Sequence, residues 1–345
     1  MKPHVFFSER FDAGAIRTLF DRACGCENGD IRDSDRVAVK VHFGEKDNTR
    51  FVPPTAIQPV VTALKERNSD FFLTDANTLY RGMRMNATDH LKIAVEHGFG
   101  TLRTRIIIAD GELGDEEEEI EIDKPIFRKV KIARQIARSD AVVAVSHFKG
   151  HILFGFGGAI KNLGMGCGSR AGKLEMHSKI KPSVGAGCLC CEQCIEICPV
   201  GAITFTGERA EINRERCIGC AKCIAVCENG AIEVPWAGAT SREAQERCAE
   251  YAFGAVLGKK RICITFINNI TSDCDCMHDS RIIGRDVGIV SSTDPVACDQ
   301  AAYDLTVEKN GRDIFRDVTG VDGTHLMKYG ERIGLGRREY TLVKI

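Results

Sequence analysis

The sequence predicts a discontinuous α/β domain with a largely parallel sheet, interrupted by a small α+β insertion. Two observations predict this class. Short apolar runs rich in β-branched residues alternate with helical patterns on both sides of residues 185–235, which is typical of a parallel sheet covered by helices. Eight cysteines lie close together inside that central stretch. Because neither flank looks complete alone, we predict one α/β domain made of residues 1–184 and 236–345, interrupted at a loop, where insertions are best tolerated.

The first flank contains four predicted strands and three predicted helices. The strands are the apolar runs at residues 36–41, 71–75, 106–108 and 141–145. The helices are expected at residues 54–66, with proline at the start, at residues 88–96, and at residues 126–139. Thr88 or Asp89 can cap the second helix, and Gly98 closes it.

The second flank resumes the same alternation. A helix is predicted from Ser241 to about Leu257, followed by strands at residues 261–266 and 287–290. Asp294 and Pro295 then open another helix, in the favoured order of an N-cap followed by proline.

The composition is that of an ordinary globular protein. A chain of 345 residues with a hydrophobic share of 43% and a charged share of 28% can bury a sizeable core, and two domains are expected. The net charge of −1 provides no basic field, so nucleic-acid binding is not expected. Charged residues come too early for a signal peptide and no apolar run could span a bilayer, so no membrane insertion is expected. Seventeen cysteines would be hazardous in an oxidising compartment, which favours a cytoplasmic protein in a reducing cell.

The central stretch repeats one cysteine spacing, C-x2-C-x2-C-x3-C. The first copy consists of Cys188, Cys191, Cys194 and Cys198, and the second of Cys217, Cys220, Cys223 and Cys227. The copies are offset by 29 residues (217 minus 188), and the sequence Gly-Ala-Ile at residues 201–203 recurs at that offset as residues 230–232. This repetition indicates an internal duplication folded about a pseudo-twofold axis.

The spacing is the one that two [4Fe–4S] clusters require. Three closely spaced thiolates reach one cluster, while the fourth cysteine of each run ligates the other cluster. We therefore assign Cys188, Cys191, Cys194 and Cys227 to cluster I, and Cys217, Cys220, Cys223 and Cys198 to cluster II. Pro199 helps to turn the chain away after the first run, although the second run has Glu228 at that position.

Three alternatives to this assignment are weaker. Structural zinc would use a longer gap between ligand pairs, and a disulfide framework would need an oxidising compartment. Cys190 offers another register for the first run, but Cys188 keeps the two copies aligned.

Two family resemblances follow from these residues. Residues 185–235 resemble bacterial-type two-cluster ferredoxins, which implies a small α+β ferredoxin-like insertion of two short hairpins and two helices. Nearly the whole chain also resembles the family known as domain of unknown function 362. This second resemblance rests on residues 146–151, 155–166, 173–178, 273–276 and 294–297. That family is described as iron–sulfur centre proteins with an inserted two-cluster module, so it implies an architecture and a cofactor but little chemistry.

A glycine-rich run at residues 155–172 follows the strand at 141–145 and marks a candidate ligand site. Ligands bind at the carboxyl ends of strands in an open α/β sheet, and loop amides with Lys161 nearby could cradle an anion. The run is neither G-x-G-x-x-G nor a P-loop. Close packing of the backbone against the sheet or the insertion is the alternative interpretation.

Cysteines and histidines outside the repeats form a candidate metal site. The set consists of Cys167, His177, Cys274 and Cys276, with His42, His147 and His151 at strand ends. Cys274 and Cys276 can both reach one metal, and Cys167 with His177 could complete a tetrahedral set if the loops converge. Taken singly, each histidine is better explained as a satisfied structural residue.

Three functions follow, in order of preference. The first is a protein with two [4Fe–4S] clusters that transfers single electrons at low potential, as a redox carrier or oxidoreductase subunit with a redox partner protein. The second is a self-contained reductase that holds flavin, a further metal or substrate on the α/β domain. The third is a binding or sensor protein with structural clusters. No Ser/His/Asp triad or paired-carboxylate arrangement can be argued, so no catalytic residue is predicted.

Overall fold

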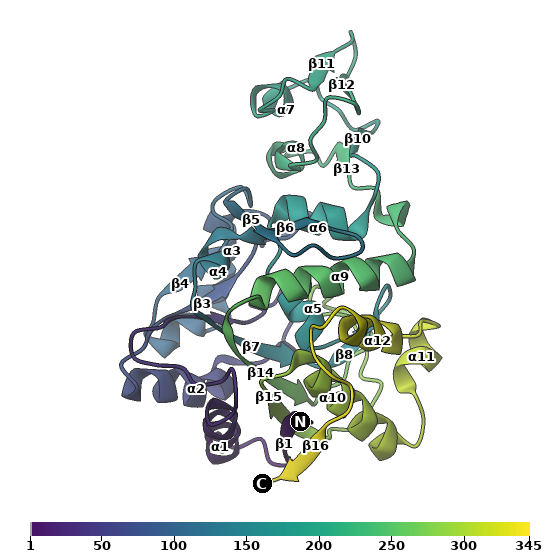
Figure 1. Ribbon diagram of the computed structural model, residues 1–345. Helices are drawn as coiled ribbons and strands as arrows, with labels where there is room; N and C mark the ends of the chain where they lie inside the picture. Colours follow the sequence, from purple (N-terminus) through teal and green to yellow (C-terminus); the bar gives the residue numbers. More distant parts are fainter. Residues whose placement is uncertain (1) are drawn as a thin grey trace.

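An eight-stranded sheet forms the centre of the structure, a computed structural model that describes residues 2–345 (Figure 1). In spatial order its strands are β16 (Thr341–Lys344), β1 (His4–Ser8), β15 (Gly288–Ser292), β14 (Lys260–Ile267), β7 (Ala141–His147), β2 (Arg36–Lys40), β3 (Asp70–Asp75) and β4 (Ile106–Ile108). The run from β14 to β4 is parallel throughout, whereas β15 is antiparallel to both of its neighbours. The sheet is largely parallel, which confirms the predicted fold class.

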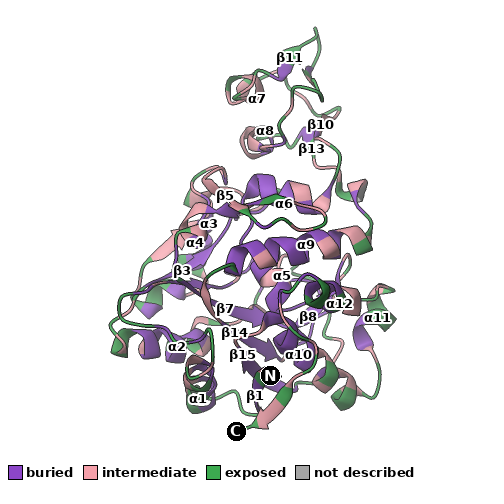
Figure 2. Cartoon of the chain, viewed as in Figure 1, coloured by how far each residue is buried: buried purple, intermediate pink, exposed green. Residues whose placement is uncertain are grey.

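The two flanks of the insertion build this sheet together. β7 precedes the insertion and β14 follows it, yet they pair in parallel register from Ala141 opposite Lys260 to His147 opposite Phe266. Every residue of β7 is buried, as expected for a central strand covered on both faces (Figure 2).

Helices cover both faces of the sheet. One apolar core lies under α1 (Ala13–Cys24), α2 (Pro54–Glu66), α3 (Ala87–Glu96) and the short 3-10 helix η1 (Phe99–Leu102). The other lies under α5 (Ala159–Gly164), α9 (Ser241–Val256), α10 (Pro295–Asn310), α11 (Ile314–Thr319) and α12 (Thr324–Arg332). Beyond α9 lies α6 (Arg170–His177), which carries the chain toward the insertion. Among the described residues, no helix combines the length and the apolar character needed to cross a membrane.

The predicted helix at residues 126–139 is wrong. The chain instead forms an antiparallel hairpin of β5 (Glu117–Glu121) and β6 (Lys129–Ala133), followed by the single turn α4 (Arg134–Ala137). Val130 and Ile132 are fully buried while Lys129 and Lys131 are not, so β6 has the two-residue period of a strand. The acidic residues of β5 lie opposite these lysines.

Smaller differences concern element ends. The N-cap of α3 is Asn86, whose side chain accepts a hydrogen bond from the Asp89 amide, rather than Thr88 or Asp89. Gly98 does adopt a left-handed conformation just beyond this helix, as predicted. Strands β1 and β16 and helix α1 were not anticipated, and they complete the sheet edge and one helical layer.

The insertion forms a small unit at one end of the molecule (Figure 1). It contains the hairpin of β11 (Ile203–Phe205) and β12 (Ala210–Ile212), the pair β10 (Ser183–Val184) and β13 (Ile232–Glu233), and the single-turn helices α7 (Gln193–Glu196) and α8 (Lys222–Val226). Leu79 and Leu174 of the α/β part pack with Ala221, Ile224 and Ile232 of the insertion in one apolar cluster. The chain returns through the short 3-10 helix η2 (Trp236–Gly238) to α9.

His90, on α3, makes stability depend on pH. Burial lowers the pKa of His90 to about 4, and the ring lies 3.6 Å from the Asp75 carboxylate. Between the ordinary histidine pKa and this lower value, the unfolded chain binds a proton that the folded protein does not, so stability falls as pH falls. We expect the native protein to lose about 2 kcal/mol more than a His90→Gln variant between pH 7 and pH 5. Urea unfolding at both pH values measures this difference, and His4→Gln, at an exposed ring, should behave like the native protein.

Candidate functional site

The insertion contains nine cysteines, and the eight of the repeated spacing line two small cavities, four to each. One cavity is lined by Cys188, Cys191, Cys194 and Cys227. The other is lined by Cys217, Cys220, Cys223 and Cys198. The fourth cysteine of each sequence run therefore lies with the first three of the other run.

The sequence duplication recurs in the backbone. Left-handed residues occur in pairs separated by 29 positions, namely Cys190 and Gly219, Glu192 and Ala221, and Gly201 and Gly230. Such residues turn the chain sharply, and here they fold each run of three cysteines around one cavity. Cys190 occupies the position of Gly219. It also lines the first cavity, and its thiol donates to the Glu208 carbonyl at 2.9 Å.

The donor groups around the cavities fit a cluster with bound thiolates. The Ala202 amide donates to Cys198 Sγ at 3.2 Å, and the Ala231 amide donates to Cys227 Sγ at 3.1 Å, again at equivalent positions. These hydrogen bonds stabilise negative charge on sulfur. Burial and the neighbouring thiol of Cys220 raise the pKa of Cys223 to about 12, so four thiolates can share such a cavity only around a cationic group. An iron–sulfur cluster satisfies both requirements.

A larger cavity of about 900 Å³ lies in the α/β part. It opens at the carboxyl ends of parallel strands, where Lys40 ends β2, Asp75 ends β3 and His147 ends β7. This edge is where open α/β sheets bind ligands. Seven of the eight residues predicted for a second site line it, namely His42, His147, His151, Lys161, His177, Cys274 and Cys276.

Cys167 lies apart from this group. It is fully buried, and its thiol is directed to the Asn162 carbonyl at 3.6 Å, so the four-residue set of Cys167, His177, Cys274 and Cys276 is not assembled. Close packing explains part of the glycine-rich run. A Cβ at Gly164 would lie 2.3 Å from the Cys248 carbonyl oxygen, and one at Gly158 would lie 2.3 Å from the Asp299 carboxylate.

Asp275 anchors the turn that carries Cys274 and Cys276. Its buried carboxylate accepts hydrogen bonds from His147 Nδ1 at 2.8 Å and Lys149 Nζ at 2.6 Å. Burial alone would raise the pKa of Asp275, but Lys149 and His147 lower it well below its usual range. The other ring nitrogen of His147 contacts the Asn268 carbonyl at 2.8 Å, so both nitrogens are engaged in holding the protein together.

The sulfur of Cys276 is surrounded by hydrogen-bond donors. Arg84 Nη2 lies 3.2 Å from it, and His42 Nε2 lies 3.5 Å from it. His42 Nδ1 accepts from the Gly44 amide at 3.0 Å, so in the neutral ring the proton is on Nε2, facing the sulfur. The hydrogen bond with Cys274 and the charge of Arg84 lower the pKa of Cys276 well below its usual value, while the same hydrogen bond and burial raise the pKa of Cys274.

A candidate metal group lies beside this pair. One ligand atom each of His151, Asp273 and Cys274 lies within 4.8 Å of the others. His151 Nδ1 accepts a hydrogen bond from the Leu153 amide at 3.1 Å, so in the neutral ring the proton is on Nε2. Nε2 can bind a metal ion only after it loses this proton. The Nδ1 atom of His177 is buried without a hydrogen-bond partner in residues 2–345.

Sequence reasoning missed several residues of this cavity. It did not select Lys149 or Tyr80, which line the cavity, or Asp275, which anchors the turn of Cys274 and Cys276. Tyr80 accepts from Arg84 Nη2 at 2.5 Å and donates to Glu45 at 3.1 Å. The sequence offers one signal for Asp275, namely an acidic residue between two cysteines. Its role in anchoring the turn becomes evident only from its contacts with His147 and Lys149 in the folded protein.

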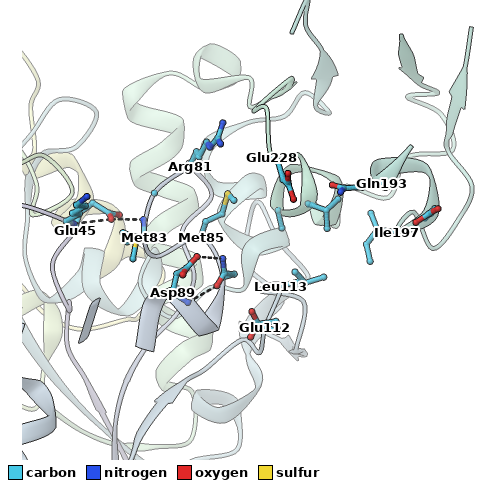
Figure 3. Close-up of a pocket in the computed structure, with 16 residues that line it drawn as sticks. Glu45, Arg81, Met83, Met85, Asp89, Glu112, Leu113, Gln193, Ile197 and Glu228 are labelled. Atoms are coloured by element: carbon cyan, nitrogen blue, oxygen red, sulfur yellow. Dashed lines mark hydrogen bonds between the residues drawn. The ribbon is translucent and has the colours of Figure 1, made fainter. Parts of the chain in front are cut away.

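Another hollow, of about 1060 Å³, lies where the insertion meets the α/β part (Figure 3). Gln193, Ile197 and Glu228 approach it from the insertion. Arg81, Met83, Met85, Asp89, Glu112 and Leu113 face them from the α/β part. Arg81 lines this hollow and the 900 Å³ cavity as well, so the two spaces are neighbours.

Fold and sites together define an α/β protein with an insertion that contains eight regularly spaced cysteines, and with a thiol-lined cavity at its sheet edge. The chain belongs to the DUF362 family, described as a domain of unknown function, whose model matches residues 37–304. Membership of this family and the clustered cysteine, histidine and aspartate side chains are consistent with metal binding. No curated protein matches it significantly.

Two solved structures show distant likeness. The lactate racemase apoprotein from Thermoanaerobacterium thermosaccharolyticum is 14% identical with a TM-score of 0.36, over 66% of this chain and 48% of that one. A crystal structure of a protein from Thermotoga maritima is 11% identical with a TM-score of 0.38, over 87% of this chain and 59% of that one. The chain thus spans about half the length of the first structure and three fifths of the second. At these TM-scores neither likeness carries an argument about function.

Proposed function

We propose that this protein binds two [4Fe–4S] clusters and transfers single electrons at low potential, as a redox carrier or an oxidoreductase subunit. The observation that carries the proposal is the crossed arrangement of the cysteines. Two cavities each gather three closely spaced cysteines and the distant fourth from the other run, as two-cluster ferredoxin motifs require. Cys188, Cys191, Cys194 and Cys227 would hold cluster I, and Cys217, Cys220, Cys223 and Cys198 cluster II. When bound, the clusters supply one-electron redox chemistry.

The surroundings of these cysteines favour electron transfer over a purely structural role. Cys191 is exposed, and the other seven are half-buried, so an external redox partner protein could approach the clusters closely. Amide donors to Cys198 and Cys227 stabilise the negative charge that reduction adds. They therefore raise the reduction potential relative to a cluster whose sulfurs accept no such hydrogen bonds. The seventeen cysteines of the chain are consistent with a reducing, cytoplasmic setting.

A second candidate function is a self-contained reductase. The specific observation in its favour is the 900 Å³ cavity with Cys274 and Cys276, which adjoins the insertion through Arg81. In this case the cavity would hold substrate, flavin or a further metal and consume the electrons from the clusters.

An inventory of anaerobically purified protein tests the proposal. We expect about eight irons and eight labile sulfides per chain, and a paramagnetic signal that appears on reduction and vanishes on reoxidation. Zinc in place of iron would contradict the proposal outright, and clusters that cannot be reduced reversibly would exclude electron transfer. Released flavin or additional metal would favour the self-contained reductase.

A further inference from the structure

We propose that Cys274 and Cys276 form a redox-active pair that cycles between dithiol and disulfide and accepts the electrons delivered by the two clusters. This inference rests on the proposed function, because it names the acceptor within the same chain. The observations that carry it are the geometry of the turn, the donors around one sulfur, and the packed loop that joins the pair to the insertion.

The two cysteines occupy a turn that brings them together. The Met277 amide donates to the Cys274 carbonyl at 2.9 Å, which closes a turn with Cys274 first and Cys276 third. A turn shortens the separation of such residues relative to an extended chain, toward the range in which a disulfide can form. Both residues line the same cavity.

The residue between them fixes the orientation of the turn. Asp275 points away from the pair into a buried site, where His147 and Lys149 hold its carboxylate. Its carbonyl also accepts from the Glu45 amide at 3.2 Å. With Asp275 held on one side, both sulfurs are directed to the cavity, and both residues line it.

The two sulfurs have different surroundings, as in other reactive dithiols. Cys276 faces the guanidinium of Arg84 and the Nε2–H of His42, whereas Cys274 is buried beside the carboxylate of Asp273. N–H donors therefore lie beside one sulfur, and a carboxylate lies beside the other. Unequal surroundings of two neighbouring sulfurs are typical of reactive dithiols.

One loop connects the pair to the cluster cysteines. Residues 76–86 join β3 to α3, and Leu79 of this loop packs in the apolar cluster that includes the partly buried Cys194, Cys223 and Cys227. The adjacent Tyr80 contacts Arg84, which in turn contacts Cys276. A continuous packed route therefore runs from the cluster ligands to the sulfur of Cys276.

The chemistry balances with two clusters. With two clusters bound, each would supply one electron. The two electrons would break the sulfur–sulfur bond between Cys274 and Cys276, and two protons from solvent would complete the dithiol. In the reverse direction the pair returns two electrons, one at a time. Two clusters that each carry one electron therefore supply the two electrons that reduction of one disulfide requires.

Mass spectrometry of the full-length protein tests this directly. Residues 262–281 form one tryptic peptide with three cysteines, Cys263, Cys274 and Cys276. After treatment with diamide, denaturation and alkylation with iodoacetamide, we expect this peptide to carry one label, and three labels before oxidation. Reduction with dithionite should restore three labels in the native protein, but not in a Cys188→Ala/Cys227→Ala/Cys198→Ala/Cys217→Ala variant that lacks both clusters.

Matched variants separate the pair from other thiols. Cys274→Ser and Cys276→Ser should each give two labels with and without diamide, whereas Cys26→Ser, outside the cavity, should keep the change from three to one. Three labels after diamide in native protein that carries both clusters would overturn the inference alone. A metal ion that is lost from Cys274→Ser, and that prevents the label change in the native protein, would assign the pair as metal ligands instead and would likewise overturn it. If no clusters are found, the proposed function fails and the acceptor role fails with it.

Discussion

Replacing Cys188 and Cys227 together by alanine is expected to remove one cluster and leave the other intact. These two residues belong to different runs in the sequence but line the same cavity, so one site loses two ligands and the other loses none. Iron should fall from about eight to about four per chain, and the paramagnetic signal of one reduced cluster should remain unchanged.

The double variant Cys188→Ala/Cys198→Ala provides the opposing case. Both residues come from the first run but line different cavities, so each site loses one ligand. The signals of both clusters should change. If each run held its own cluster, the results of the two double variants would be exchanged. Cys190→Ala is the matched control and should keep about eight irons, because the Cys190 thiol bonds to the Glu208 carbonyl.

Removing the ammonium partner of Asp275 is expected to have the largest effect on stability. Lys149 and Asp275 are buried and lie 2.6 Å apart, and Lys149→Met would leave a buried carboxylate with His147 alone. Breaking a buried pair from one side costs about 3–5 kcal/mol of unfolding free energy. Urea unfolding near pH 7, followed by circular dichroism under anaerobic conditions, measures the loss.

The direction of the pH dependence follows from the same pair. The pKa of Asp275 in the folded protein lies well below its usual value, so its stabilising contribution is present above the ordinary aspartate pKa and is lost as pH falls below that value. The matched control is Lys129→Met, which removes an exposed partner of Glu119 at 3.5 Å and should cost about 0–1 kcal/mol. Equal effects of the two lysine variants would show that Asp275 does not depend on Lys149.

Local patterns were enough to predict the fold class and most of the central sheet. Buried strands of a parallel sheet are short apolar runs, and five such runs coincide with β2, β3, β4, β7 and β14 to within two residues at either end. The helix predicted at 126–139 was wrong because a short segment with alternating lysines supports a strand only when a partner lies beside it. That partner, β5, is an acidic strand whose pairing the local pattern did not anticipate.

The cysteine spacing was enough to predict which cysteines line one cavity, because ligand spacing within a short duplicated unit is a local property, and the left-handed residues that fold it recur at the same offset. The composition of the second site, in contrast, depends on long-range contacts. Arg84 and His42 meet Cys276 across separations of 192 and 234 residues, and Cys167 faces the interior although it lies in the same glycine-rich run as Lys161. These contacts depend on the order of the parallel strands in the sheet, because the carboxyl ends of strands that are distant in sequence lie at the same edge.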